Sequence, residues 1–424
     1  MQEVQIGVLG LGTIGAELVY IIQSNAKRVE NEYGIRLSIK KVFVRDLTKK
    51  RNVDVKGLTL TNRIEDILED EEISVIAECI GGNGSGQTLD YVKQALQKGK
   101  TVIMSSKKTL ALYGPELLWM AKENQVMIQY DATVGGGIPI AKILENCFYG
   151  ERVKKVSGIV NATSNFICSK MLEEKLDYHT ALAQAQACGY AENDPSDDVD
   201  GYDALYKAVI LSMFCFEKYF DPRKVTPKSI RVIGLFDMQV ASELGYSIKP
   251  IFSIEDQGES LQYHVGPCLV KADSILGKIN DNHNIIIVNG ELTRHLAFFG
   301  QGAGKEPTAS AMFDDILNAL ICQRKPMSGE GPIPAFEQLD ERYTQYYMHL
   351  AVPDTLGVMA AVTKVLSDTG LNIDKLVTKD KVNDFYDVVV FTSKAEGSLV
   401  EEQLTKALEE VCVRLVTLLP ILSS

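Results

Sequence analysis

Residues 4–132 alternate short apolar runs with amphipathic stretches. The apolar runs predict buried strands, and the amphipathic stretches, whose apolar positions recur with helical spacing, predict helices. Strict alternation of the two indicates a parallel, doubly wound sheet of the Rossmann type. The predicted strands are 4–10, 38–44, 74–80, 101–106 and 126–132, and the predicted helices are 13–24, 63–70, 86–98 and 114–123.

From about residue 133 the pattern changes to longer helical stretches followed by strands, which predicts a mixed α/β second domain. We expect a further helix over 308–323 to close this domain. The other predicted helices are 164–175, 178–188 and 201–216, and the strands are 249–255, 260–265 and 284–289.

The segment KPMSGEGPIPAF (325–336) is rich in Pro and Gly and predicts a linker. After it, strands and helices follow in the order βαββαβ, which is typical of a small ferredoxin-like module. Its predicted elements are 343–352, 357–369, 372–379, 384–393, 398–411 and 413–421. The expected division is a Rossmann domain (1–132), an α/β catalytic and dimerisation domain (133–324), a linker (325–342) and a C-terminal module (343–424).

Composition narrows the class of protein. The net charge of −12 and the lack of a Lys/Arg block disfavour a nucleic-acid partner, which needs a concentrated basic face. No apolar run reaches the length of a membrane span and no leader precedes the first strand, so we expect a cytoplasmic protein without a membrane partner. The eight cysteines are scattered without a CxxC pair, which predicts reduced, mostly buried thiols and no zinc site.

The segment Gly10-Leu11-Gly12-Thr13-Ile14-Gly15 ends the first predicted strand and opens the first helix. The first glycine permits a tight turn, the second lets the backbone approach a pyrophosphate, and the third allows close packing of helix on strand. The free N–H groups of the helix start favour an anion. The context therefore predicts a dinucleotide site, and a purely structural glycine turn is the alternative.

The end of the second predicted strand bears on the choice of dinucleotide. Asp46 offers a partner for a ribose hydroxyl, whereas Arg45 suits a 2′-phosphate. Lys49, Lys50 and Arg51 follow closely, and a solvated basic loop is the alternative interpretation. We expect NADP, with NAD also accepted.

Two segments carry candidate chemistry. Ser106 and Lys107 come just after a strand of the parallel sheet, where ligands of such sheets lie, although a lone lysine there is often a surface residue. Asp203 and Lys207 differ by four positions and share one helix face. An exposed ion pair is one interpretation, and a proton donor beside a reducible carbonyl is the other. The acidic residues crowded here also suit a substrate ammonium group: Glu192, Asp194, Asp197, Asp198, Asp200 and Asp203.

The chain resembles the homoserine dehydrogenase family in a series of motifs that appear in the family's order and spacing. The resemblance extends to about residue 325, and the module after the linker resembles the ACT domain of monofunctional members. The motifs are GLGTIG (10–15), the SSK segment (105–107), DATVGGGIP (131–139), GIVNATSNFI (158–167), GYAENDPSDDVDGYDALYK (189–207) and GQGAGKEPTASA (300–311).

The resemblance implies reversible, NAD(P)-dependent reduction of L-aspartate 4-semialdehyde to L-homoserine, in threonine, methionine and isoleucine biosynthesis. Lys207 matches the proton donor, and Lys107 matches the lysine that orients substrate and nicotinamide. Glu192 would bind the amino end of the substrate, while Asp198 and Asp203 would shape the same pocket.

The resemblance also implies further ligands and partners. Gly302 would contact the cofactor, and the backbone carbonyls of Val134, Gly136 and Ile138 would hold a sodium ion, unless the segment is only a flexible glycine turn. A homodimer is expected, or a homotetramer through the ACT modules. An amino-acid effector such as threonine would bind near Gly357; a purely structural module is the alternative.

The chain departs from the family pattern at four positions. Asp131 stands where Glu is usual, Ser106 replaces Asn, Ala162 replaces Gly, and Leu356 replaces the Pro before Gly357. A glycine position can require a positive φ, so Ala162 is expected to change the backbone there. Ser106 and the altered turn at 161–165 leave open a related reductase of another amino-acid semialdehyde. A non-catalytic amino-acid sensor that keeps the fold is a third hypothesis.

Overall fold

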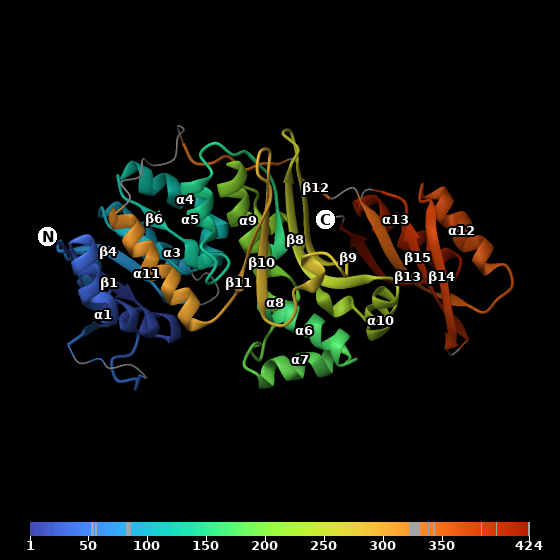
Figure 1. Cartoon of the computed structure of the whole chain (residues 1–424), viewed down its shortest axis with the longest axis horizontal. Helices are drawn as coiled ribbons and strands as arrows, with labels where there is room; N and C mark the ends of the chain where they lie inside the picture. The colour runs from blue at the N-terminus through green and yellow to red at the C-terminus, as the bar shows by residue number, and fades with distance from the viewer. Residues whose placement is uncertain are drawn as a thin grey trace. The chain divides into compact units, whose positions relative to one another are not determined.

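The computed structural model describes residues 1–51, 55, 57–81, 86–321, 331–337, 339–341, 344–382, 384–395 and 397–422. The chain forms two compact units, each made of three segments. Figure 1 labels the helices and strands described below. The first unit comprises Met1–Lys154, Tyr206–Val225 and Val288–Glu337, and the second comprises Lys155–Leu205, Thr226–Ile287 and Gln338–Ser424. Of the predicted linker, residues 325–330, 338 and 342 lie outside the described residues.

The first unit contains a parallel sheet of six strands in the order β3-β2-β1-β4-β5-β6. The prediction of a doubly wound Rossmann sheet is therefore confirmed. Because the strand order reverses between β1 and β4, the switch point, where such sheets bind ligands, lies at their carboxyl ends. The strands are β1 (Gln2–Leu9), β2 (Ile35–Phe43), β3 (Thr59–Thr61), β4 (Ile73–Glu78), β5 (Thr101–Met104) and β6 (Ile128–Gln129).

Helices flank this sheet, and the first and fourth of the predicted ones are longer than expected by seven residues or more. The first runs on to Tyr33 and ends at Gly34, whose φ of 68° suits a helix C-terminus. The fourth begins at Lys107 rather than at residue 114, because the chain stays helical through Pro115. The helices are α1 (Thr13–Tyr33), α2 (Glu65–Leu68), α3 (Gly86–Gln97), α4 (Lys107–Glu123), α5 (Ile140–Cys147) and α11 (Lys305–Ile321), with strand β11 (Arg294–Gln301) before the last.

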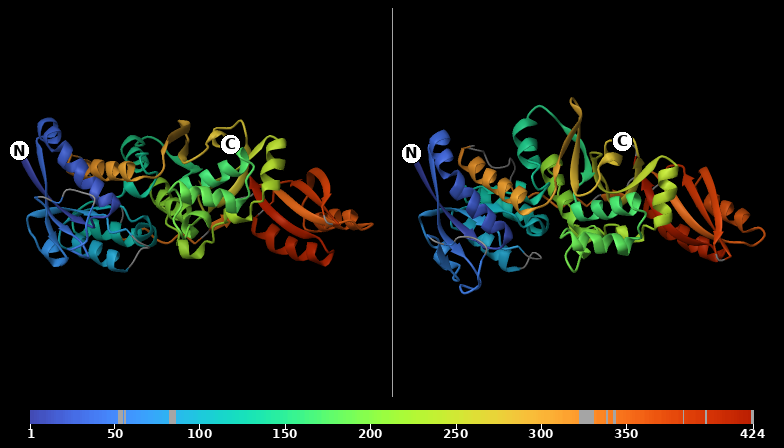
Figure 2. Two further views of the ribbon diagram at one scale, coloured as in Figure 1. Left: turned by 90° about the horizontal axis from the view of Figure 1, so that it is seen from below. Right: turned by 60° about the horizontal axis from the view of Figure 1, so that its bottom comes forward.

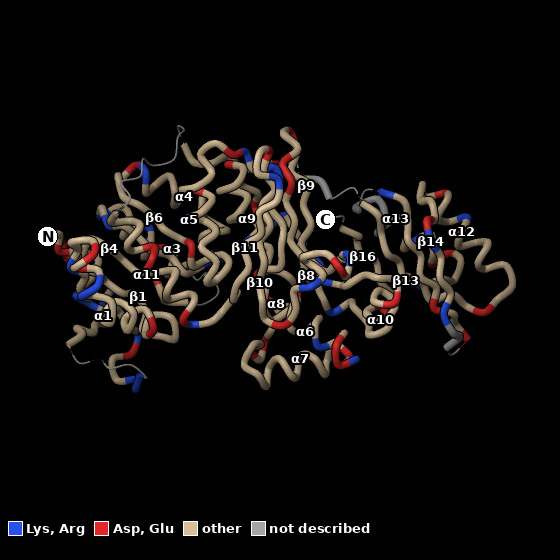
Figure 3. The backbone as a smooth tube through the Cα atoms, viewed as in Figure 1, with Lys and Arg blue, Asp and Glu red and all other residues tan. Residues whose placement is uncertain are grey.

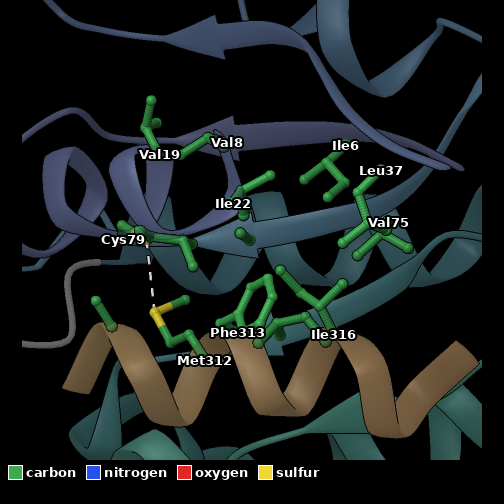
Figure 4. Packing of buried hydrophobic residues seen from close by; sticks show 14 of the residues in the cluster. Ile6, Val8, Val19, Ile22, Leu37, Val75, Cys79, Met312, Phe313 and Ile316 are labelled. Atoms are coloured by element: carbon green, nitrogen blue, oxygen red, sulfur yellow. Dashed lines mark hydrogen bonds between the residues drawn. The ribbon is translucent and has the colours of Figure 1, made fainter. Parts of the chain in front are cut away.

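The expectation that the helix over 308–323 closes the second domain is wrong. Met312 and Phe313 of α11 share a buried core with Val8 and Ile22, on the Rossmann sheet and on α1 (Figure 4). The Sγ atom of Cys79, just after β4, lies 3.7 Å from the Sδ atom of Met312. Figure 2 shows α11 beside α1 from two further sides. The apolar face of the helix was predictable, but the sheet that it covers was not.

The second unit is built on antiparallel strands covered by helices. The pairing of β8 with β9 is continuous from Tyr246↔Lys271 to Asp256↔Leu261. The predicted helices are present, and α9 (Tyr202–Phe216) runs from the second unit into the first. The other elements are β7 (Val153–Ile159), α6 (Ala162–Glu173), α7 (Tyr178–Ala187), α8 (Ser196–Val199), α10 (Leu235–Glu243), β8 (Tyr246–Asp256), β9 (Leu261–Lys271) and β10 (His283–Gly290).

The C-terminal part of the second unit has the predicted βαββαβ order, and its antiparallel strands lie in the order β16-β13-β15-β14. This ferredoxin-like arrangement continues the sheet of the same unit, because Ile421 of β16 pairs in parallel with Leu269 of β9. A short strand, β12 (Leu339–Glu341), also pairs with β9. The elements are β13 (Gln345–Pro353), α12 (Val358–Asp368), β14 (Ile373–Val382), β15 (Phe385–Thr392), α13 (Gly397–Glu410) and β16 (Arg414–Ile421).

The distribution of charged residues does not indicate a particular class of binding partner. Lys and Arg are interspersed with Asp and Glu along the chain (Figure 3). Among the described helices, none combines the length and apolar character that crossing a membrane requires.

The seven described cysteines are free, but only Cys79, Cys168 and Cys268 are buried, so the expectation of mostly buried thiols holds only in part.

Candidate active site

Three glycines shape the turn from β1 to α1. Gly10 has a φ of 101°, and a Cβ atom there would lie 2.6 Å from the carbonyl oxygen of Cys79. At Gly15 a Cβ atom would lie 2.1 Å from the carbonyl oxygen of Gly10. Nothing lies within 4 Å of the corresponding position at Gly12, so the space above it is open. The first and third glycines let the turn pack, and the second leaves room for a ligand.

A cavity of about 630 Å³ opens over this turn, a size in the range of small-molecule sites. Lys49, Lys50 and Arg51 line it from the loop after β2, and Lys305 lines it from the start of α11. The Nζ atom of Lys305 lies 2.9 Å from a carboxylate oxygen of Glu17, which also lines the cavity. This excess of cations suits a ligand that carries several phosphate charges.

Arg45 and Asp46, which were predicted to decide between NADP and NAD, have different surroundings from each other. Arg45 is exposed and is not among the residues that line the cavity; the three cations that follow it are. The Oδ1 atom of Asp46 accepts hydrogen bonds from the hydroxyl and the backbone N–H of Thr48, at 2.7 and 2.8 Å, and these bonds lower the pKa of Asp46. The carboxylate thus has partners of its own within its loop.

Glu78 lies at the carboxyl end of β4 and is fully buried. One carboxylate oxygen accepts the backbone N–H of Ile80 at 3.0 Å, and the other accepts those of Ser105 and Ser106 at 3.3 and 3.0 Å. Burial raises the pKa of Glu78, although hydrogen bonds from Ser106 and the backbone favour its charged form. Sequence reasoning missed this residue; the available signal was an acid inside an otherwise apolar strand, SVIAECI.

In the first unit, the chain segments that contain Lys107 and Lys207 lie close to each other. Lys107 is the first residue of α4, and the Nζ atom of the adjacent Lys108 lies 5.7 Å from the ring centre of Tyr206. Lys207 follows Tyr206 on α9 and is only 8% exposed. A buried lysine is rare unless it has a structural or chemical task.

Asn161 joins two of the predicted carboxylates in the second unit. Its Nδ2 atom donates to Asp198 at 2.7 Å and to Asp203 at 2.9 Å. Its Oδ1 atom accepts the backbone N–H of Ser164 at 2.8 Å and so caps the start of α6. Glu192, by contrast, is exposed and takes no part in these bonds. Asn161 belongs to the motif GIVNATSNFI (158–167), but the sequence did not predict its hydrogen bonds to the two carboxylates.

The glycine loop after η1 (Asp131–Thr133) lies against the GQGAG loop. Gly135 and Gly136 have φ angles of 76° and 62°, and a Cβ atom on Gly136 would lie 2.6 Å from the carbonyl oxygen of Gly302. The loop is therefore a close backbone contact, and two segments far apart in the sequence meet there.

Near this loop, the buried carboxylates of Asp131 and Asp315 both lie close to the ammonium group of Lys142. The Nζ atom of Lys142 lies 3.0 Å from Asp315 and 3.7 Å from Asp131. Burial raises the pKa of Asp131 to about 6 and that of Asp315 to about 7, against the opposing charge of Lys142. Within the described part of the chain, no three His, Cys, Asp or Glu residues are grouped so that they could hold a metal ion.

Comparison with known proteins identifies the family. The model described as "Homoserine dehydrogenase, NAD binding domain" matches residues 10–131, and the model described as "Homoserine dehydrogenase" matches residues 139–317. The homoserine dehydrogenase of Bacillus subtilis is 35% identical over 414 residues, which cover 95% of each chain. The chain belongs to the homoserine dehydrogenase family.

Other relatives agree with this assignment. The homoserine dehydrogenase of a Synechocystis species is 33% identical and covers 96% of each chain. The crystal structure of a homoserine dehydrogenase from Thiobacillus denitrificans superposes with a TM-score of 0.89 at 28% identity and covers 100% of this chain and 99% of that one. That from Staphylococcus aureus gives 0.81 at 30% identity and full coverage of both. The chain is thus an oxidoreductase that carries the NAD-binding domain of its family.

Two of the departures from the family pattern, Ala162 and Ser106, lie at the starts of helices. Ala162 is the first residue of α6, and its φ is not positive, so alanine fits this position without backbone strain. Ser106 precedes α4 and is held through its backbone N–H by Glu78. Asp203 and Lys207 are 3% and 8% exposed, which rules out the interpretation of an exposed ion pair.

Two members of the acidic run have structural tasks instead. Asp194 accepts from the hydroxyl of Ser196 at 2.6 Å, at the start of α8. Asp200 lies 2.8 Å from the guanidinium of Arg231 and accepts from Ser229. Of the carboxylates predicted to bind the substrate, Asp198 and Asp203 are joined by Asn161, whereas Glu192 is exposed.

Proposed function

We propose that the chain catalyses the reversible, NAD(P)-dependent reduction of L-aspartate 4-semialdehyde to L-homoserine. The observation that carries the proposal is the buried pair Asp203 and Lys207, one turn apart on α9, in a chain that belongs throughout its length to this family. A buried ammonium next to a carboxylate is suited to donate a proton to an oxygen that gains charge.

The nicotinamide would supply the hydride to the aldehyde carbon. Lys207 protonates the alkoxide oxygen that develops, and Lys107, at the N-terminus of α4, stabilises its negative charge. Asp198 and Asp203, fixed by Asn161, bind and orient the ammonium group of the substrate, and Glu192 contacts it from the exposed loop before α8.

The cofactor fits the first unit. The open space over Gly12 would receive the pyrophosphate at the N-terminus of α1, and Lys49, Lys50 and Arg51 would hold a 2′-phosphate. Asp46 has partners within its own loop, which favours NADP over NAD. A hyperthermophilic archaeal homoserine dehydrogenase of 26% identity and TM-score 0.62 has been solved in complex with NADPH; it covers 76% of this chain and 98% of that one.

The remaining predictions concern an ion, an effector and assembly. A sodium ion held by carbonyls of Val134, Gly136 and Ile138 is supported by the close meeting of backbone segments there, with Gly302 beside it. An effector at the turn of the C-terminal module is supported by Gly357, whose φ is 89°, in the predicted strand–helix turn. A cytoplasmic homodimer or homotetramer and the domain boundaries given above stay predictions.

The test of the reaction is homoserine-dependent reduction of NADP and of NAD by the full chain, followed by the absorbance of the reduced nicotinamide. We expect turnover with homoserine and a higher kcat/KM with NADP. Amino alcohols one carbon shorter or longer serve as controls for the alternative of a related reductase. A protein that binds the dinucleotide but turns over none of these substrates would overturn the proposed reaction and favour the sensor.

Gly12→Ala tests the cofactor site. The φ of Gly12 is −85° and nothing lies within 4 Å of the added Cβ, so we expect unchanged stability. Because the methyl group enters the space meant for the pyrophosphate, we expect NADP affinity to fall by about tenfold or more, or about 1.4 kcal/mol. Gly150→Ala, equally open and away from the cavity, is the matched control. Equal affinities of the two variants in a calorimetric titration would place the pyrophosphate elsewhere.

A further inference from the structure

Glu78 is a buried acidic residue that the reaction as proposed does not use. It ends β4, pairing with Leu9 of β1 on one side and with Met104 of β5 on the other. It therefore lies beside the switch point between β1 and β4, at the carboxyl edge of the sheet. Taking a carboxylate out of water is costly unless hydrogen bonds replace the lost solvation, so an apolar residue would suit the strand better for stability alone.

The carboxylate joins two loops. Its Oε1 atom accepts the N–H of Ile80 at 3.0 Å in the loop after β4. Its Oε2 atom accepts the N–H groups of Ser106, at 3.0 Å, and Ser105, at 3.3 Å, in the turn after β5. The hydroxyl of Ser105 donates back to the carbonyl oxygen of Glu78 at 2.9 Å. Side chain and backbone of one residue thus fix the turn from both directions.

That turn sets the start of α4. Ser106 is the residue before the helix, and Lys107 is its first residue, with its N–H donating to the carbonyl oxygen of Ser105 at 3.1 Å. The direction of the Lys107 side chain therefore depends on a backbone whose N–H groups end on Glu78. A displacement of about 1 Å at a reacting group can cost about a hundredfold in rate.

We propose that Glu78 is a positioning residue for the reaction: its carboxylate locks the Ser105–Ser106 turn to the loop after β4 and so holds Lys107 in its working place. This inference rests on the proposed function. Only a carboxylate offers acceptor oxygens to both loops at once. In Glu78→Gln one of these oxygens becomes an NH₂ donor facing an N–H donor, so one loop is released.

The same unit holds a matched control. Glu151 also accepts three backbone N–H groups, from Arg152, Leu292 and Thr293, at 3.0, 3.0 and 2.7 Å. It fixes the turn between β10 and β11 and lines no part of the nucleotide cavity. Glu151→Gln loses a comparable set of bonds without touching the turn before Lys107.

The experiment measures kcat, NADP affinity and amide hydrogen exchange in the full chain for the wild type, Glu78→Gln and Glu151→Gln. We expect Glu78→Gln to lower kcat for homoserine oxidation by about tenfold to a hundredfold and to speed exchange at Ser105 and Ser106, with unchanged NADP affinity. Glu151→Gln should leave kcat at the wild-type value. A kcat of Glu78→Gln equal to that of either other protein overturns the proposal, whereas a wild type without turnover overturns the proposed reaction instead.

A double-mutant cycle separates positioning from general stabilisation. If Glu78 acts through Lys107, Glu78→Gln costs little further kcat in a Lys107→Ala background. Additive losses, as two independent defects would give, contradict the proposal. Should Glu78→Gln yield no folded protein, Glu78→Asp keeps the carboxyl group but is too short to reach both loops, and it is judged by the same criteria.

Discussion

Lys207→Met lowers the kcat of homoserine oxidation by about 10²- to 10⁴-fold, the range that general acid–base catalysis supplies. Methionine is one atom shorter than lysine but replaces its apolar stem, so the 8% exposed site stays largely filled. Only the proton-carrying ammonium group is removed. We therefore expect an unchanged affinity for NADP, because the nucleotide cavity is lined by other residues.

The control for Lys207→Met is Lys108→Met. Lys108 also contributes a positive charge in this neighbourhood, since its Nζ atom lies 5.7 Å from the ring centre of Tyr206, the residue before Lys207. Loss of this charge changes the local field but removes no proposed proton donor. Similar losses of kcat in the two variants, or a Lys207→Met enzyme that keeps more than about a tenth of the wild-type kcat, would assign proton donation to another group.

The sequence predicted those parts of the fold that a local pattern determines. The parallel sheet of the first unit followed from alternation, because strands covered on both faces are continuously apolar and their crossovers need helices. The βαββαβ order of the C-terminal part followed in the same way. The pattern of α11 gave its apolar face at Met312 and Phe313 but not its partner, α1, because α11 lies nearly three hundred residues further along the chain.

The candidate site was predictable to the same degree. Charged residues in unusual places, such as Asp203 and Lys207, could be chosen from spacing. Asn161 could not be identified in this way, because its partners Asp198 and Asp203 are 37 and 42 residues away. Sequence alone does not distinguish such a residue from any other polar residue in a turn. The sequence did not predict a role for Glu78, because most of its strand is apolar and matches the pattern of a buried core strand.

A second large effect is expected at Asp237 of α10, which is 1% exposed. Its carboxylate accepts hydrogen bonds from Tyr347 of β13 and Thr417 of β16, both at 2.9 Å, and from the N–H of Gly234 at 3.1 Å. The Nδ1 atom of His349, also on β13, lies 3.0 Å from it. Asp237 thus ties the C-terminal strands to α10 within the second unit.

Asp237→Ala lowers the free energy of unfolding by roughly 3–5 kcal/mol, because the buried donors of Tyr347, Thr417 and His349 lose this acceptor, each at a cost of about 1–3 kcal/mol. The matched control is Glu243→Gln on the same helix. Glu243 pairs with Lys379 of β14, but both side chains are substantially exposed, at 59% and 32%. Removal of such a surface pair costs at most about 1 kcal/mol.

The same network makes stability depend on pH. Burial alone would lower the pKa of His349, but hydrogen bonds and charges of Asp237 and Asp387 outweigh it and raise the pKa above 6.5. The folded protein therefore binds the proton more tightly than the unfolded chain. The stabilising contribution is fully present below pH 6.5 and is lost as the pH rises through the folded pKa.

Chemical denaturation at a series of pH values on either side of that window, with amide exchange of β13 as the local readout, measures this contribution. Asp237→Asn keeps the shape but removes one of the two charges that hold the proton, so we expect a smaller fall in stability with rising pH than in the wild type. Glu243→Gln should keep the wild-type slope. If Asp237→Asn and the wild type lose stability in parallel, the imidazolium is not held by Asp237, and the network stabilises the second unit through neutral hydrogen bonds alone.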